Sequence, residues 1–152
     1  MKALTSFFDN FDLAKIVPAT DVILEKVVIV MRWAVMVGPL ILLVLGLVYL
    51  FLPPKEANHR FGFRTWFGMG SVEAWQFTQK AAGLAWGGLG LILTVVMAII
   101  SSGFKTKAPV EIVELAGKCM VWQIVLAAVS ALVVSVLAAV LFDRHGNRRN
   151  KK

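Results

Sequence analysis

Cysteine and histidine are scarce in this sequence of 152 residues, which holds one cysteine and two histidines. Cys119 has no second thiol for an internal disulfide or for a cysteine-based metal site. His59 and His145 stand apart from any cluster of cysteines and carboxylates, and neither a nucleophile elbow nor a phosphate-binding loop occurs. We therefore predict no enzyme, no cofactor and no metal. A weak metal site formed by Glu56, Asn58 and His59 is less favoured than a solvated turn.

Charged residues are also few, at 16% of the chain, whereas 59% of the residues are hydrophobic. Three stretches contain no Asp, Glu, Lys or Arg at all: residues 33–52, 81–100 and 119–142. A helix needs roughly 20 mainly apolar residues to cross a hydrocarbon layer of about 30 Å. The sequence therefore predicts an all-α integral membrane protein with three transmembrane helices, forming a single domain over residues 1–152 of a multi-pass cell-membrane protein.

Acidic residues are fewer than basic ones, and the net charge is +7. The basic residues lie around the ends of the apolar runs rather than in one patch, which favours lipid headgroups over nucleic acid as the partner. The first loop and the tail (143–152) together carry nine Lys and Arg, against seven in the remaining connections. The excess of Lys and Arg in the first loop and the tail grows when only residues near the helix ends are counted. We therefore expect the first loop and the C-terminus in the cytoplasm and the N-terminus outside.

The N-terminal segment has apolar residues at helical spacing. They are Leu4, Phe7, Phe8 and Phe11, at positions i, i+3, i+4 and i+7. This spacing predicts a short amphipathic helix within residues 1–20, which either lies on the membrane surface or packs on the protein's own loops. We expect Pro18 to end it, and Thr20 or Asp21 to cap a new helix that continues into the first crossing.

The dipeptide Gly38-Pro39 lies inside the first apolar run. Pro39 has no N–H to donate to the carbonyl of Val35, so a kink is expected there. The kink is either a hinge or a packing feature. We favour packing, because membrane helices tolerate proline where neighbouring helices satisfy the freed carbonyl.

Small residues form stripes on the second and third apolar runs. The stripes consist of Gly83, Gly87 and Gly90 on the second, and Ala127, Ala131, Ser135 and Ala139 on the third. Such stripes let helix backbones approach closely within lipid. We expect the second and third helices to pack together through them. Self-association through one stripe is a less favoured alternative, because GxxxG spacing is a permissive pattern.

The loop over residues 53–80 is unusually aromatic. Phe61, Phe63, Trp66 and Phe67 fall within seven positions, and we expect them at the headgroup level or against the helices. Further along, Ser71 followed by Glu73 predicts a helix start, with the serine as N-cap and the acid in the first turn. Trp75 is then expected one turn into that helix, at the depth of the membrane interface.

The order of residues in this loop resembles the SdpI family of bacterial membrane proteins, which takes its name from an immunity protein against a sporulation-delaying toxin. The similar positions are Pro53-Pro54, Asn58, Gly62-Phe63-Arg64-Thr65, a Met/Gly/Ser turn that includes Ser71, then Glu73 and Trp75. The resemblance covers about residues 50–90. Trp66 stands where a proline often follows the Arg-Thr pair. The chain is also shorter than the immunity protein, so the resemblance implies the fold of the motif more strongly than the same role.

The motif residues have a specific and a simpler interpretation. In the specific one, Arg64 pairs with Glu73 while Asn58 and Thr65 hydrogen-bond around the pair, which makes the loop a rigid cytoplasmic lid. In the simpler one, Arg64 anchors the loop to phosphate headgroups, Asn58 caps a turn, Glu73 favours its helix terminus and Trp75 lies at the interface.

Membrane transport normally requires ionisable groups at membrane depth, and the three runs contain none. A pump or channel formed by a single chain is therefore disfavoured. The remaining class is a membrane interaction protein. The resemblance implies immunity against, or sensing of, a membrane-active peptide toxin through the loop and helices. The alternative is a structural accessory subunit or assembly factor, whose partner is a larger membrane protein complex.

Overall fold

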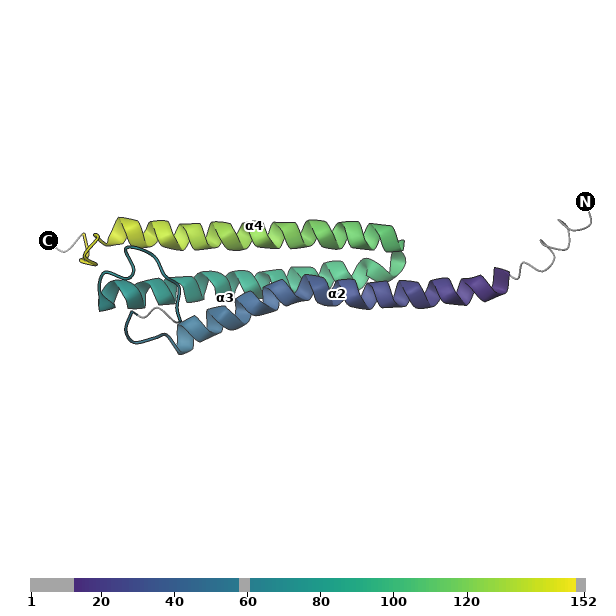
Figure 1. Cartoon of the computed structure of the whole chain (residues 1–152), viewed down its shortest axis with the longest axis horizontal. Helices are drawn as coiled ribbons and strands as arrows, with labels where there is room; N and C mark the ends of the chain where they lie inside the picture. The colour runs from purple at the N-terminus through teal and green to yellow at the C-terminus, as the bar shows by residue number, and fades with distance from the viewer. Residues whose placement is uncertain (1–12, 58–60, 150–152) are drawn as a thin grey trace, which may run out of the picture.

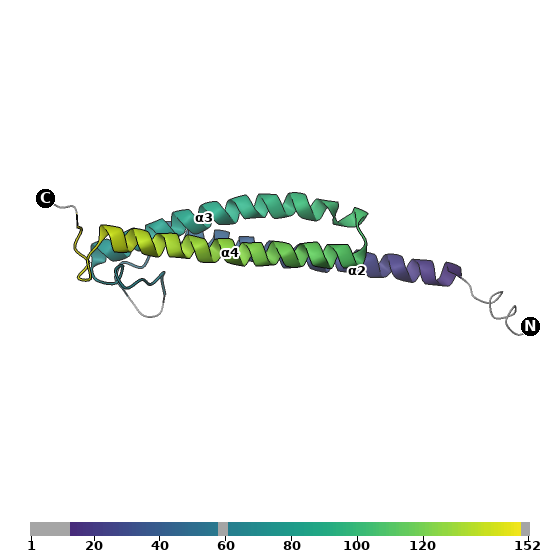
Figure 2. The ribbon, with the colours of Figure 1, turned by 90° about the horizontal axis from the view of Figure 1, so that it is seen from above.

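The computed structural model describes residues 13–57 and 61–149, the first eight of them as backbone only. The elements in chain order are α2 (Leu13–Phe51), α3 (Val72–Ser102), a 3-10 helix η1 (Gly103–Thr106) and α4 (Pro109–Leu141). Figure 1 shows α2, α3 and α4 side by side, and Figure 2 shows from a second direction that α2 extends beyond the other two. The start of α2 and the end of α4 lie at opposite ends of the bundle.

Each of the three long helices is apolar and long enough to span a membrane. Large hydrophobic side chains cover their outer surfaces, for example Leu84 (67% exposed) on α3 and Ile124 (70% exposed) on α4. An apolar surface of this extent suits lipid rather than water. The prediction of an all-helical, membrane-embedded protein with three spanning helices is thus confirmed.

The prediction that the helix is interrupted near the start of the chain is wrong. We predicted that Pro18 ends one helix and that Thr20 or Asp21 caps another, but α2 is a single helix from Leu13 to Phe51. Proline removes one backbone hydrogen bond of a helix, and the 39-residue helix α2 continues through it. The predicted amphipathic helix within residues 1–20 falls largely outside the described residues.

The glycine stripe of α3 packs against α2 rather than α4. A Cβ added at Gly46 of α2 would collide with the backbone of Gly87, and one added at Gly90 would collide with the backbone of Leu43. A Cβ added at Gly83 would lie 2.9 Å from the backbone nitrogen of Leu50. The expected pairing of this stripe with the third helix is therefore wrong. The physical reason is Gly46, which lets the backbones of α2 and α3 meet directly.

The small-residue stripe of α4 is half-buried at Ala127, Ala131, Ser135 and Ala139. The buried line of α4 runs beside it. Its members are Ile112, Ala116, Cys119, Gln123, Val134 and Ala138. Ser130 joins this face, since its Oγ accepts a hydrogen bond of 3.1 Å from Nε1 of Trp86 on α3.

The carbonyl left without a donor by Pro39 has a partner on another helix. Nε2 of Gln123 on α4 donates to the oxygen of Val35 at 3.0 Å, and both residues are buried. A Cβ at Gly38 would lie 2.6 Å from Oε1 of the same glutamine, so the glycine makes room for it. Figure 1 shows α2 changing direction partway along its length. Neighbouring α4 thus supplies the hydrogen bond that the packing interpretation of the proline requires.

Candidate functional site

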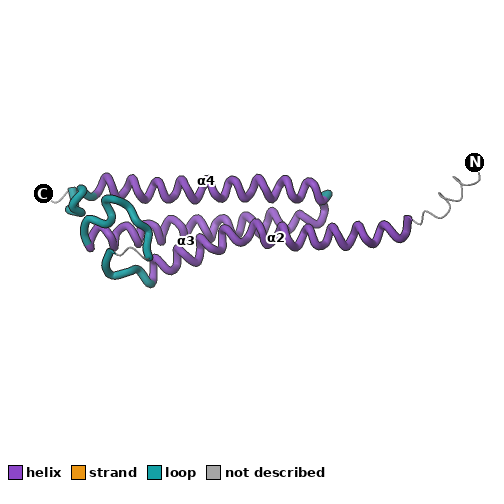
Figure 3. The backbone as a smooth tube through the Cα atoms, in the orientation of Figure 1, coloured by secondary structure: helices purple, strands orange, loops and turns teal. Residues whose placement is uncertain are grey.

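Two connections meet at one end of the bundle, which we call the loop end. One is the connecting loop (residues 52–71) between α2 and α3, and the other is the C-terminal turn (residues 142–149) after α4. Figure 3 shows both as loop segments at the same end. The residues of the family-like motif that the structure describes belong to this end. Asn58 lies outside the described residues.

Trp75 is the centre of the loop end. Its side chain is fully buried, and its Nε1 donates a hydrogen bond of 2.9 Å to the carbonyl of Pro54 at the start of the connecting loop. The expected depth of Trp75 at the membrane interface stays a prediction, but its complete burial inside the protein was not foreseen. The loop folds over the indole and supplies the acceptor that a buried indole nitrogen needs.

Gln79 fixes the middle of the connecting loop. Its side chain is fully buried, and its amide makes two hydrogen bonds of 2.8 Å with the backbone of Phe63, donating to the carbonyl and accepting from the N–H. Gln79 was not among the residues predicted from the sequence. The available signal was its position four residues after Trp75, which places both side chains on one face of α3.

At Gly62 the loop backbone passes close to the ring of Trp75. The glycine's φ of +123° is a backbone angle that residues with a side chain rarely adopt. A Cβ at this position would lie 2.6 Å from the indole ring. The following Phe63 packs edge-on against Trp86, with ring centroids 5.1 Å apart. Trp66 is 78% exposed, so the aromatic residues divide between the protein core and the surface.

Thr65 begins a tight turn in the loop. Its Oγ1 accepts a hydrogen bond of 2.9 Å from the N–H of Gly68, and its carbonyl accepts one of 3.1 Å from Met69. A Cβ at Gly68 would lie 2.6 Å from the hydroxyl oxygens of both Thr65 and Thr78, so the turn sits tightly on α3. Thr65 therefore holds the backbone of its own turn.

Ser71 is the N-cap of α3, as predicted. Its Oγ accepts from the N–H of Ala74 at 3.1 Å and donates to the carbonyl of Gly146 at 2.7 Å. Glu73 lies in the first turn of α3, where a negative charge is favourable. One serine thus caps α3 and ties the C-terminal turn to it.

The C-terminal turn is ordered around Asp143. Its carboxylate accepts hydrogen bonds from the backbone N–H groups of Asn147 (2.8 Å) and His145 (2.9 Å). These bonds, that from Asn147 above all, hold the pKa of Asp143 below its ordinary value. Gly146, at φ +76°, packs on the backbone of Gly70 and Ser71. The sequence predicted only a basic tail here.

Arg64 and Glu73 are both exposed at the loop end, each with its own interactions. The predicted ion pair between them stays a prediction. Together with Trp66, Arg64 gives the connecting loop a cationic and an aromatic side chain on its outer surface. Such a surface is suited to binding, and within residues 13–57 and 61–149 no cluster of His, Cys, Asp or Glu is arranged to hold a metal.

Comparison with known proteins places the chain in a family. The model of the SdpI/YfhL protein family matches residues 55–139, more than half of the chain. The match begins in the connecting loop and includes α3 and most of α4. No curated protein and no solved structure matches the chain. The chain therefore belongs to the SdpI/YfhL family and is a membrane protein of the SdpI type.

Proposed function

We propose that this protein is a non-enzymatic membrane protein that gives immunity against, or senses, a membrane-active peptide toxin. The proposal rests on family membership and on one feature of the loop end. The connecting loop is held from inside by Trp75 and Gln79, while Arg64 and Trp66 remain exposed. A surface that is already ordered binds a partner with little further loss of entropy.

The recognition surface we propose combines Arg64 and Trp66 on the connecting loop with the adjoining helices. Tryptophan and arginine are the residues that most often dominate binding energy at interfaces. In a membrane-active peptide, Trp66 would contact apolar side chains and Arg64 would contact carboxylates or backbone carbonyls. Gly62, Thr65, Ser71 and Trp75 then act by holding the loop.

We place the loop end in the cytoplasm, with the N-terminus outside, because of the Lys and Arg bias. Single cysteines introduced at Trp66 and at Asp21 in a Cys119→Ala background test this orientation. A membrane-impermeant maleimide applied to intact cells should label the second position and leave the first unlabelled. The reverse labelling would contradict the orientation.

The test of immunity is deletion of the gene followed by challenge with a membrane-active peptide toxin, and a small secreted peptide encoded beside the gene would be the first one to use. Cells lacking the protein should become more sensitive, and the wild-type chain should restore resistance. Unchanged sensitivity would refute immunity. Stable co-purification with a multi-subunit membrane complex would favour an accessory subunit or assembly factor instead.

Complementation with variants assigns the effect to the loop. Arg64→Gln should restore less resistance than Arg60→Gln, because Arg60 lies outside the positions that carry the family resemblance. The folded yield of each variant in detergent separates a loss of binding from a loss of structure. Equal resistance with both variants would leave Arg64 as a headgroup anchor.

A further inference from the structure

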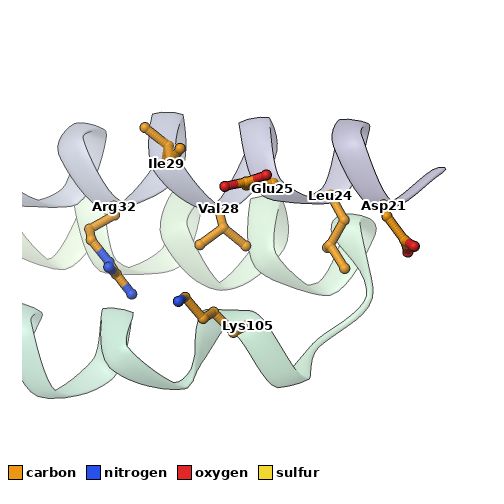
Figure 4. Close-up of a pocket in the computed structure, with 7 residues that line it drawn as sticks. All are labelled: Asp21, Leu24, Glu25, Val28, Ile29, Arg32 and Lys105. Carbon is orange, nitrogen blue, oxygen red and sulfur yellow. The ribbon is translucent and has the colours of Figure 1, made fainter. Parts of the chain in front are cut away.

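The opposite end of the bundle, formed by residues 21–32 of α2 together with η1, contains a groove of about 440 Å³. Arg32 immediately precedes the uncharged run 33–52, and Lys105 follows the uncharged run 81–100. The groove therefore lies where the hydrocarbon layer gives way to lipid headgroups. Figure 4 shows its lining residues.

Two cations converge in this groove. Figure 4 shows the guanidinium of Arg32 and the ammonium of Lys105 turned toward each other from α2 and η1. Two unit charges of the same sign repel each other at such a site unless an anion lies between them. Within the described part of the chain, neither cation has a carboxylate at ion-pair distance.

Arg32 has donors that the protein leaves unused. Its Nη2 donates to the carbonyl of Ser101 at 3.0 Å, which fixes the position of the guanidinium. Its Nε is buried and has no hydrogen-bond partner among the described residues. A buried unpaired donor is costly, and a guanidinium binds phosphate oxygens through two parallel donors. Arg32 therefore keeps hydrogen-bonding capacity of the kind that phosphate oxygens use.

Two carboxylates line the part of the groove that lies further from the membrane. Asp21 and Glu25 are exposed and lie on the same side of α2 as Arg32, closer to the start of the helix (Figure 4). At 1.5 Å per residue, Glu25 lies roughly 10 Å further out than Arg32 along the helix axis. The order from the membrane outward is thus two cations and then two carboxylates.

We propose that this groove binds the headgroup of a zwitterionic aminophospholipid such as phosphatidylethanolamine. The phosphate, which lies next to the glycerol, binds Arg32 and Lys105. The primary ammonium, which lies further out, meets Glu25 and Asp21. A purely anionic headgroup would place its outer part against the carboxylates without a compensating positive charge.

The test uses the full chain in nanodiscs of phosphatidylcholine that contain equal minor fractions of phosphatidylethanolamine and phosphatidylglycerol. After extraction in mild detergent, the lipids that remain bound are quantified by mass spectrometry. The wild-type chain should enrich phosphatidylethanolamine over both other lipids. Enrichment of phosphatidylglycerol to the same degree would show a simple anion site and overturn the proposal, as would no enrichment at all.

Variants of exposed side chains keep the test independent of folding. Lys105→Gln should lower the enrichment of phosphatidylethanolamine about threefold. Glu25→Gln should weaken the preference for phosphatidylethanolamine over phosphatidylglycerol. Lys118→Gln is the matched control, because Lys118 is an exposed cation already paired with Glu114 at 2.7 Å. If Lys105→Gln and Glu25→Gln both behave as the wild type does, the proposal is wrong.

Discussion

The two ends of the helical bundle differ in whether their buried polar groups have hydrogen-bond partners. At the loop end, the buried amide of Gln79 is paired on both sides with Phe63, and the nitrogen of Trp75 is paired as well. At the opposite end, Arg32 donates to Ser101 while its buried Nε has no partner in the described chain. Among the described residues, the buried side chains of the loop end have their hydrogen-bond partners, whereas the opposite end keeps one buried donor unpaired. Paired buried groups hold the surface of the loop end in place, whereas an unpaired buried donor requires a separate explanation, for which we propose a bound lipid headgroup.

The largest expected effect concerns the residue at the centre of the loop end. Trp75→Ala removes a fully buried indole and should lower the free energy of unfolding by about 3 kcal/mol. Trp66→Ala is the control, because Trp66 is 78% exposed, and its effect should be small. Thermal unfolding in detergent measures both. Equal losses would mean that the loop end is not held by Trp75.

The next prediction tests the hydrogen bonds of the connecting loop. Gln79→Leu leaves the backbone N–H and carbonyl of Phe63 without partners and should cost about 2 kcal/mol. It should also speed proteolysis of the loop. Gln76→Leu is the matched control, since Gln76 is exposed on the same helix. Similar cleavage rates for the two variants would contradict a rigid loop.

Gln123 lies between the two ends, and its hydrogen bond to α2 is expected to contribute less stability than the buried groups of the loop end. Gln123→Leu removes the donor to Val35 and should destabilise the bundle by about 1 kcal/mol, as is typical of hydrogen bonds between membrane helices. Ser135→Ala is the comparison, because the Ser135 hydroxyl donates within its own helix α4, to the carbonyl of Ala131. Unfolding in detergent with both variants measures the difference. A greater loss from Ser135→Ala would refute the interhelical role.

The smallest effect is the pH dependence of the C-terminal turn. Because the pKa of Asp143 is lowered in the folded protein, its contribution to stability is present above the ordinary value of about 3.9. The contribution is lost as the pH falls through the lowered pKa. Hydrogen exchange at the amides of His145 and Asn147 should therefore gain protection from Asp143 at neutral pH and lose it in acid. Asp143→Asn should remove this pH dependence, and its persistence in that variant would point to another group.

Some features of the site follow from residues that are close in sequence. The N-cap at Ser71 depends on Ala74 only three residues away, so a serine before an acidic first turn was enough to predict it. The burial of Trp75 and the role of Gln79 depend on Pro54 and Phe63, across a loop whose path no local pattern specifies. The position of the motif in the chain could therefore be predicted from local residue order, whereas the burial of its tryptophan under the loop could not.

The long helices and their number were determined by the sequence itself, because lipid requires every spanning segment to satisfy its own backbone within one continuous apolar run. Which helices and turns pack against one another was decided only by the tertiary structure. Gly87 packs on Gly46, and Ser71 bonds to Gly146 from 75 residues away. The physical reason is that lipid is as apolar as the helix surfaces, so hydrophobicity drives each helix into the membrane without selecting its partner. Close backbone packing and a few interhelical hydrogen bonds make that selection.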